Sequence, residues 1–139
     1  MNPFNLNSED VVNEIHEFNS KLAQGYKTLA DLGEIEVGVS EKEAVYHEDN
    51  LVLYHFKSRT KKQNSVPLLI VYALVNRPYM ADLQDGRSMI QGLLDEGVDV
   101  YLIDWGYPVS ADKYLTLDDY ITGYIDRCVD VICEKHNRK

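Results

Sequence analysis

The sequence contains little cysteine and shows no pattern of metal ligands. Its two cysteines, Cys128 and Cys133, are five residues apart. On a helix this spacing places the two side chains on different faces, which does not favour a disulfide. There is no C-x-x-C pair, and the four histidines are scattered along the chain. A structural zinc site is therefore not predicted.

Basic residues are also in short supply. The chain has 14 Lys and Arg against 23 Asp and Glu, for a formal net charge of −9. A nucleic-acid-binding protein needs clustered positive charge to neutralise phosphates, so this class is not expected. The one basic cluster, at 57–62, is interpreted as a solvated loop between two strands.

Long apolar runs are absent. The longest, at 66–75, is too short to span a bilayer and contains a proline. Residues 1–7 lack the basic start and apolar run of a secretory signal. These features predict a cytoplasmic protein without a transmembrane segment.

The first 33 residues predict a separate amphipathic helix. Ser8 is a suitable cap, and Glu9 and Asp10 follow where the helix dipole favours acids. Gly33 is expected to end the helix. The helix could lie on its own domain or dock a partner subunit, and the pattern favours neither. Its apolar stripe consists of Val11, Ile15, Phe18, Leu22 and Leu29.

Residues 34–139 predict a second, α/β domain. Two β-prone runs, 44–47 and 51–56, flank a short polar gap and indicate a hairpin. The apolar run 66–73 is typical of a strand buried on both faces. A short helix at 89–94 and a second buried strand at 98–103 follow. Strands that alternate with helices imply a parallel sheet.

A longer helix is predicted from Thr116 to about His136. Thr116 and Asp119 fit a capping box, with Asp in place of the usual Glu. The regular apolar spacing indicates one wide face that lies on a sheet. This face consists of Leu117, Tyr120, Ile121, Tyr124, Ile125, Cys128, Val129 and Ile132.

Chemistry in such a fold is expected at the carboxyl ends of the parallel strands. Two loops qualify, at 74–80 and 104–108, and both combine proline with polar and aromatic residues. Each could form a pocket wall or a rigid connection. For Asp104 and Trp105 we favour a role in bracing the loop over lining a site.

Three ordered blocks of the sequence resemble the catalytic subunit of class III polyhydroxyalkanoate synthases. They are 66–79 (VPLLIVYALVNRPY), 99–108 (DVYLIDWGYP) and 115–130, and the likeness extends upstream to 38–40 and 44–46. It covers nearly the whole chain. Long, ordered and non-repetitive blocks are far more specific than a short motif.

The resemblance implies a fold and an activity. It implies the N-terminal part of an α/β-hydrolase fold: an amphipathic helix, a β-hairpin, then β-α-β-α. The family comprises acyltransferases that polymerise (R)-3-hydroxyacyl-CoA, such as 3-hydroxybutyryl-CoA, into polyester with release of CoA. The substrate is a CoA thioester, and no cofactor or metal is implied. The implied partners are a second, PhaE-type synthase subunit and the polyester granule, whose surface is an implied location.

The family's catalytic residues are not found in this chain. The family has a nucleophilic cysteine in a Gly-x-Cys-x-Gly-Gly turn, activated by a histidine and completed by an aspartate. That turn follows the helix that corresponds to 116–136, and no Gly-x-Cys-x-Gly occurs among the 139 residues. We therefore expect a fragment truncated before the nucleophile elbow and inactive alone. Cys128, Cys133 and His136 are rejected as replacements.

One piece of catalytic machinery is expected to remain. By analogy with α/β-hydrolases, the loop after the 66–73 strand supplies one oxyanion-hole amide, and the backbone N–H of Val75 or Asn76 is the candidate. The strand order implied by the resemblance makes 66–73 a sheet edge, so we expect a marginal or self-associating chain. The alternatives are a non-catalytic stub that binds the partner subunit or granule, and a small ligand-binding domain.

Overall fold

A computed structural model describes residues 8–31 and 37–138, which belong to two compact units, 1–35 and 36–139. The boundary expected between residues 33 and 34, and the helix-ending role of Gly33, lie outside the described residues. The first unit contains helix α1 (Ser8–Asp31), as the apolar spacing predicts. None of the described helices is long and apolar enough to cross a membrane.

The apolar stripe of α1 is exposed within its own unit. The side chain of Phe18 is 65% exposed, and Ile15 and Leu22 are about half exposed. Lys21 and Glu17 form an ion pair one turn apart, at 2.7 Å, on the charged part of the helix surface. Nothing in this unit covers the described stripe, so the choice between its two interpretations stays open.

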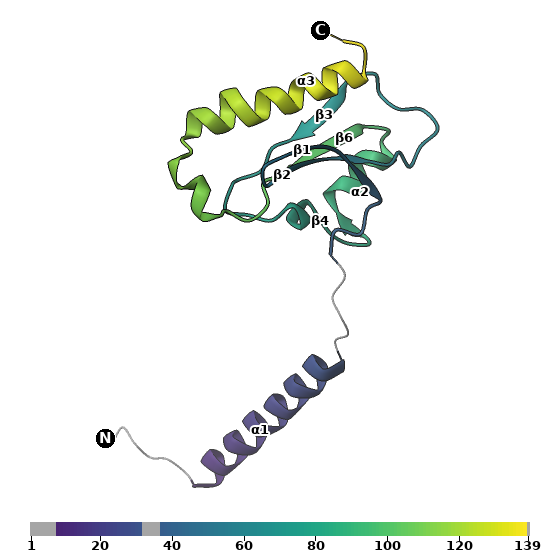
Figure 1. The fold of residues 1–139 in the computed structure, drawn as a ribbon. Helices are drawn as coiled ribbons and strands as arrows, with labels where there is room; N and C mark the ends of the chain where they lie inside the picture. Colours follow the sequence, from purple (N-terminus) through teal and green to yellow (C-terminus); the bar gives the residue numbers. More distant parts are fainter. Residues whose placement is uncertain (1–7, 32–36, 139) are drawn as a thin grey trace, which may run out of the picture. The chain divides into compact units, whose positions relative to one another are not determined.

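The second unit is built on a four-stranded sheet (Figure 1). Its strands are β1 (Lys42–Glu48), β2 (Leu51–Phe56), β3 (Pro67–Ile70) and β6 (Asp99–Asp104), in the order β1-β2-β6-β3. The β1–β2 and β2–β6 pairs are antiparallel, and β3 and β6 are parallel. The predicted hairpin and parallel pair are thus confirmed, and β3 lies at the sheet edge as expected.

The prediction that 66–73 is a strand buried on both faces is wrong. Strand β3 is only four residues long, Leu68 is 39% exposed, and the flanking Val66 and Val71 are more exposed still. The reason is that β3 has a neighbour, β6, on one side only. A continuous apolar run indicates that a segment tends to be buried. How much of it is buried depends on the strands and helices that lie beside it.

Both faces of the sheet are covered by helices, one on each side (Figure 1). On one face Leu53 and Ile103, paired across β2 and β6, pack with the long C-terminal helix. On the other face Val100 and Leu102 pack with helix α2 (Met89–Asp95). The side chains of β6 alternate between the two faces and so contribute to both cores, which explains the apolar run of four residues between Asp99 and Asp104.

A small hairpin precedes α2 and was not predicted. It consists of β4 (Asp82–Gln84) and β5 (Arg87–Ser88), with Gly86 at φ +71° between them. Asp82 is 2% exposed, and its carboxylate accepts hydrogen bonds from the backbone N–H and hydroxyl of Ser40 and from the Ser88 hydroxyl. The Ser88 oxygen also accepts the Gln91 N–H at 3.0 Å, which caps α2.

The C-terminal helix begins as predicted but is not wound uniformly. Thr116 and Asp119 form the expected capping box: the Asp119 carboxylate accepts from the Thr116 N–H and hydroxyl, and the Asp119 N–H donates back. Residues 117–118 are α-helical, η3 (Asp119–Ile125) is a π-helix, and α3 (Asp126–Lys135) completes the element. Hydrogen bonds from Thr116 lower the pKa of the Asp119 carboxyl, which favours its charged, capping form.

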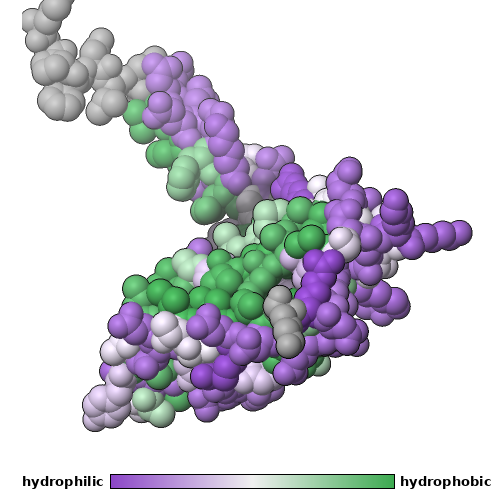
Figure 2. Space-filling view, turned by 90° about the horizontal axis from the view of Figure 1, so that it is seen from above, coloured by the Kyte–Doolittle hydropathy of each residue, from purple (hydrophilic) through white to green (hydrophobic). Residues whose placement is uncertain are grey.

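Only part of the wide apolar face of this helix is buried. Tyr124, Cys128 and Ile132 are buried against the sheet, whereas Ile121 and Val129 are more than 40% exposed. Beside β3 an apolar groove of about 300 Å³ opens between the helix and the sheet edge. Figure 2 shows apolar side chains gathered on this unit. The groove is lined by Val66, Pro67, Leu69, Val129, Ile132, Cys133, His136 and Arg138.

Candidate functional site

The first candidate loop, 74–80, follows β3 with three residues, 71–73, between them. Residues 73–76 form a turn in which the Asn76 N–H donates to the Ala73 carbonyl at 3.0 Å. A short 3-10 helix, η1 (Pro78–Ala81), follows Arg77. Val75, one of the two predicted oxyanion residues, is 90% exposed. Its neighbour Asn76 already uses its backbone N–H inside the turn.

The second candidate loop, 104–108, begins where β6 ends and is bonded to the first. The Asp104 carboxylate accepts the Gly106 N–H at 3.0 Å and the Tyr72 hydroxyl at 3.3 Å. The Trp105 indole N–H donates to the Tyr72 carbonyl at 3.0 Å. Asp104 and Trp105 thus connect the two loops, which is the bracing role favoured from the sequence.

Arg77 makes a further connection between the loops. Its Nη1 donates to the Gly106 carbonyl at 3.2 Å, and the guanidinium carbon lies 3.6 Å from the centre of the Tyr107 ring. Gly106 has a φ of +67°, and a Cβ there would lie only 2.4 Å from the Asn50 carbonyl oxygen. A glycine is therefore required at this point of close approach.

The Tyr72 hydroxyl is kept protonated by its surroundings. Burial, and secondly the charge of Asp104, raise its pKa to about 12. The phenol is therefore a hydrogen-bond donor across the physiological pH range. The arrangement can hold two backbone segments in fixed relation, but among the described residues it contains no activated nucleophile.

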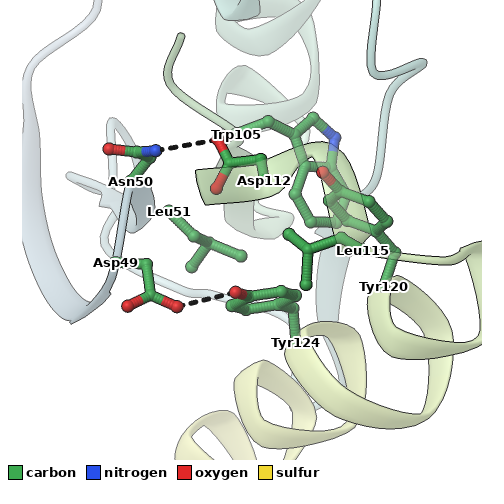
Figure 3. A pocket seen from close by; sticks show the side chains of 8 residues that line it. All are labelled: Asp49, Asn50, Leu51, Trp105, Asp112, Leu115, Tyr120 and Tyr124. Atoms are coloured by element: carbon green, nitrogen blue, oxygen red, sulfur yellow. Dashed lines mark hydrogen bonds between the residues drawn. The ribbon is translucent and has the colours of Figure 1, made fainter. Parts of the chain in front are cut away.

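An aromatic cluster joins Trp105 of the 104–108 loop to two tyrosines of η3, Tyr120 and Tyr124 (Figure 3). Trp105 and Tyr120 meet edge to face with ring centroids 5.4 Å apart, and the Tyr124 hydroxyl donates to Asp49 at 2.6 Å. That hydrogen bond, together with burial, raises the pKa of Tyr124 to about 12. The space between these side chains is about 20 Å³, enough for one water molecule and too small for an acyl substrate.

The two cysteines rejected from the sequence differ in their surroundings. Both are free thiols. Cys128 is fully buried, and burial raises its pKa to about 11, so the nucleophilic thiolate is disfavoured. Cys133 lies half-buried in the groove beside β3.

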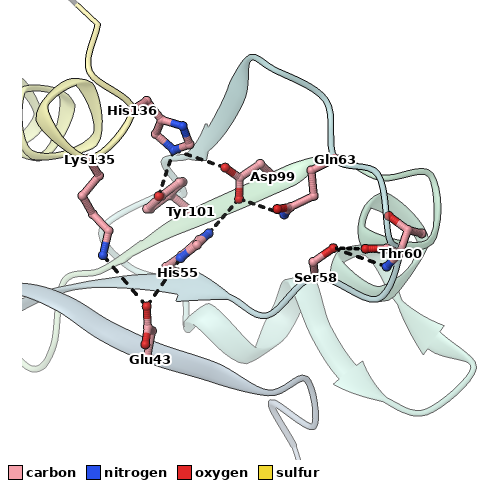
Figure 4. A network of polar contacts seen from close by, with 9 residues as sticks. All are labelled: Glu43, His55, Ser58, Thr60, Gln63, Asp99, Tyr101, Lys135 and His136. Carbon is pink, nitrogen blue, oxygen red and sulfur yellow. Dashed lines mark hydrogen bonds and ion pairs between the residues drawn. The ribbon is translucent and has the colours of Figure 1, made fainter.

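His136 lies at the opposite end of the sheet from the candidate loops, in a polar network around Asp99 (Figure 4). Asp99 is the first residue of β6, and its carboxylate contacts the Nε2 atoms of His55 at 2.7 Å and His136 at 3.2 Å. Gln63 donates to the same carboxylate, also at 3.2 Å. Sequence reasoning placed His136 near the helix end but missed this network, because the three segments lie far apart along the chain.

A metal centre is not indicated by the described side chains, since no group of three His, Cys, Asp or Glu residues among them is arranged to hold an ion. The candidate site is therefore the pair of loops at the carboxyl ends of β3 and β6. Sequence reasoning located both loops, but it did not identify Tyr72 and Arg77 as the residues that tie them together.

The chain is similar to polymerases of polyhydroxyalkanoates. A subunit named poly(3-hydroxyalkanoate) polymerase subunit PhaC from Thiocystis violacea is 56% identical over 137 residues, and one from Allochromatium vinosum is 54% identical over 138. A third, from a Synechocystis species, is 50% identical over 133 residues. The first two alignments cover 98% of this chain but 39% of each relative, so the chain spans about two fifths of their length.

A family model gives the same result over a defined part of the chain. The model described as the N-terminus of poly-beta-hydroxybutyrate polymerase (PhaC) matches residues 5–93. This match includes α1, the hairpin, β3 and the turn that carries Val75. It covers well over half of the 139 residues, and so the chain belongs to the PhaC N-terminus family of poly-beta-hydroxybutyrate polymerases.

Proposed function

We propose that this chain forms the first part of the catalytic subunit of a class III polyhydroxyalkanoate synthase with an α/β-hydrolase fold. The proposed activity of the whole enzyme is transfer of (R)-3-hydroxyacyl groups from CoA thioesters to a growing polyester, with release of CoA. The observation that carries the proposal lies at the carboxyl ends of two adjacent parallel strands, where the residues that flank the 73–76 turn are bonded to the 104–108 loop. Active sites of open α/β sheets lie at this edge.

The proposed contribution of this chain to catalysis is one oxyanion-hole amide. Val75 and Asn76 are the candidates, and the geometry favours Val75. The Asn76 N–H would first have to leave the Ala73 carbonyl, whereas Val75 lies 90% exposed at the tip of the turn. Such a donor stabilises the negative charge on the carbonyl oxygen as a thiolate attacks the thioester.

The 139 residues alone are proposed to be inactive. They contain no Gly-x-Cys-x-Gly turn, and Cys128 is buried with a raised pKa. The first experiment is to sequence the source DNA beyond the codon for Lys139 and, if the frame continues, to express both the 139-residue chain and the longer product. We expect CoA release from (R)-3-hydroxybutyryl-CoA by the longer product only. Release by the 139 residues alone would contradict the proposal.

The oxyanion assignment has its own test in that longer product. Val75→Pro removes the backbone N–H, and Val75→Ala is the matched control that keeps it. We expect the proline variant to lower kcat by about 100- to 1,000-fold. Equal activity of the two variants would show that the Val75 amide takes no part.

A second candidate function is binding without turnover, to the PhaE-type subunit or to the polyester granule. The observation that favours it is the exposed apolar stripe of α1, including Phe18 at 65% exposure. Phe18→Glu places a charge in the stripe, whereas Asn13→Glu places the same charge elsewhere on the helix. We expect only Phe18→Glu to abolish retention of the chain on purified partner subunit or granules.

A further inference from the structure

Both flanks of the 73–76 turn are tied to one and the same segment, residues 104–107. Tyr72 precedes the turn and Arg77 follows it, and each is bonded to this segment, which starts at the last residue of β6. Because the turn itself is closed by a single backbone hydrogen bond, these ties are the contacts that fix its position.

The tie before the turn uses two groups of Tyr72. Its carbonyl accepts the Trp105 indole N–H at 3.0 Å, and its hydroxyl donates to the Asp104 carboxylate at 3.3 Å. The same carboxylate oxygen accepts the Gly106 N–H at 3.0 Å. Backbone and side chain of one residue are thus held by successive residues of the other loop, which fixes where the turn begins.

The tie after the turn depends on the half-buried side chain of Arg77. Its guanidinium donates to the Gly106 carbonyl at 3.2 Å and stacks on the Tyr107 ring at 3.6 Å. A planar guanidinium combines these two contacts in one geometry, which an ammonium group cannot. Gly106 lies so close to Asn50 that a Cβ there would be 2.4 Å from the Asn50 carbonyl oxygen.

A turn that carries a catalytic amide gains from such support. Val75 is 90% exposed and so has almost no packing of its own to hold its backbone. Hydrogen-bond donors aimed at a developing charge are effective only when they are positioned before the reaction. Fixing the residues on either side removes the freedom that the exposed tip would otherwise have.

We propose that Arg77 and Trp105 are positioning residues that clamp the 73–76 turn onto the 104–107 segment and so orient the Val75 amide. This inference rests on the proposed function for its catalytic meaning but not for its structural test. Neither residue is proposed to touch the substrate.

The structural test measures amide hydrogen exchange by NMR in the 139-residue chain. Arg77→Met keeps the aliphatic stem and removes the guanidinium, and Trp105→Phe keeps an aromatic ring and removes the N–H. We expect the Asn76 amide, which closes the turn, to exchange about tenfold faster or more in each variant. Amides of the β2–β6 ladder, such as that of Ile103, should keep their protection.

The matched control is Lys113→Met, because Lys113 also lies over a tyrosine ring, that of its neighbour Tyr114 at 4.7 Å, but connects no second loop. Arg77→Lys should give a smaller acceleration than Arg77→Met. Unchanged Asn76 exchange in Arg77→Met, or equal loss of protection at Asn76 and Ile103, would overturn the clamp. The Arg77 variant decides the matter even if Trp105→Phe fails to fold.

A second readout separates the clamp from the proposed function. In the longer product, Arg77→Met should lower kcat by about 10- to 100-fold and leave KM nearly unchanged. Faster Asn76 exchange with an unchanged kcat would support the clamp and refute the oxyanion role of the turn. An unchanged exchange rate with a lowered kcat would refute the clamp.

Discussion

The imidazole of His55 lies flat against the phenol of Tyr101, with ring centroids 4.2 Å apart and 8° between the ring planes. The two residues are partners across β2 and β6, so the sheet register sets the stacking. His55 also contacts the Asp99 carboxylate, and the Tyr101 hydroxyl lies 3.1 Å from Nε2 of His136. The pair thus joins the sheet to the end of α3.

We predict that Asp99→Asn destabilises the domain by about 2–4 kcal/mol. The Asp99 side chain is 6% exposed, and its two oxygens meet His55, His136 and Gln63. An amide offers one acceptor oxygen where the carboxylate offers two, and it places an NH₂ group against a donor. The measurement is the free energy of unfolding in urea. Asp130→Asn, at an exposed position of α3, is the control and should change it by less than about 0.5 kcal/mol.

Two glycine substitutions are predicted to act in opposite directions. Gly106→Ala should cost about 2 kcal/mol or more, because φ is +67° and the new Cβ would lie 2.4 Å from the Asn50 carbonyl oxygen. Gly92 lies in α2, and a Cβ there meets nothing within 4 Å. Gly92→Ala should therefore stabilise the domain by about 0.5–1 kcal/mol. Thermal unfolding of both variants checks this, and a stable Gly106→Ala protein would contradict the close approach.

The helices and strands of this fold are predicted well where the local sequence pattern matches the burial that the rest of the fold gives the segment. The capping pair Thr116 and Asp119 acts locally, so its residues could be identified without knowing the rest of the fold. Residues 100–103 are all apolar because both faces of this strand meet helices. The hairpin that carries Asp82 is held by hydrogen bonds to the distant Ser40, which no local pattern contains. The π-helical winding at 119–125 was not predicted either.

The location of the candidate site could be predicted from the sequence, but the contacts between its residues could not. The loops after β3 and β6 follow from the alternation of strands and helices. The clamp pairs Tyr72 with Trp105 and Arg77 with Gly106, each about 30 positions apart in the sequence. Such pairings come from strand register, which the apolar pattern alone does not fix.

The exposed groove beside β3 leads to a prediction of concentration-dependent association. Val66 is 64% exposed and Val129 42% exposed, next to a strand edge with unpaired backbone groups. We expect sedimentation velocity to show self-association of the 139-residue chain that the double variant Val66→Lys, Val129→Lys reduces.

The control for this prediction is Val12→Lys, which puts one lysine into the exposed surface of α1. Association abolished by Val12→Lys and unchanged by the groove variant would assign it to α1 instead. A monomer at all concentrations, with a sharp and reversible unfolding transition, would contradict the expectation that the edge drives association.

The buried thiol of Cys128 predicts a specific loss of stability at alkaline pH. Burial raises its pKa from the ordinary value of 9.0 to about 11, so the folded chain binds this proton more tightly than the unfolded chain does. The resulting stabilisation is complete below about pH 9 and is lost as the pH rises through about 11. By pH 10 the loss should reach about 1.4 kcal/mol.

Comparison with Cys128→Ala isolates this effect from the tyrosines, whose raised pKa values act in the same direction. The difference in unfolding free energy between the unmodified chain and Cys128→Ala should shrink by about 1.4 kcal/mol between pH 8 and pH 10. A thiol reagent at pH 8 should modify Cys133 in the folded chain and reach Cys128 only on unfolding, since Cys128 is 0% exposed. Rapid modification of both thiols in the folded chain would show that the helix does not hold Cys128 against the sheet.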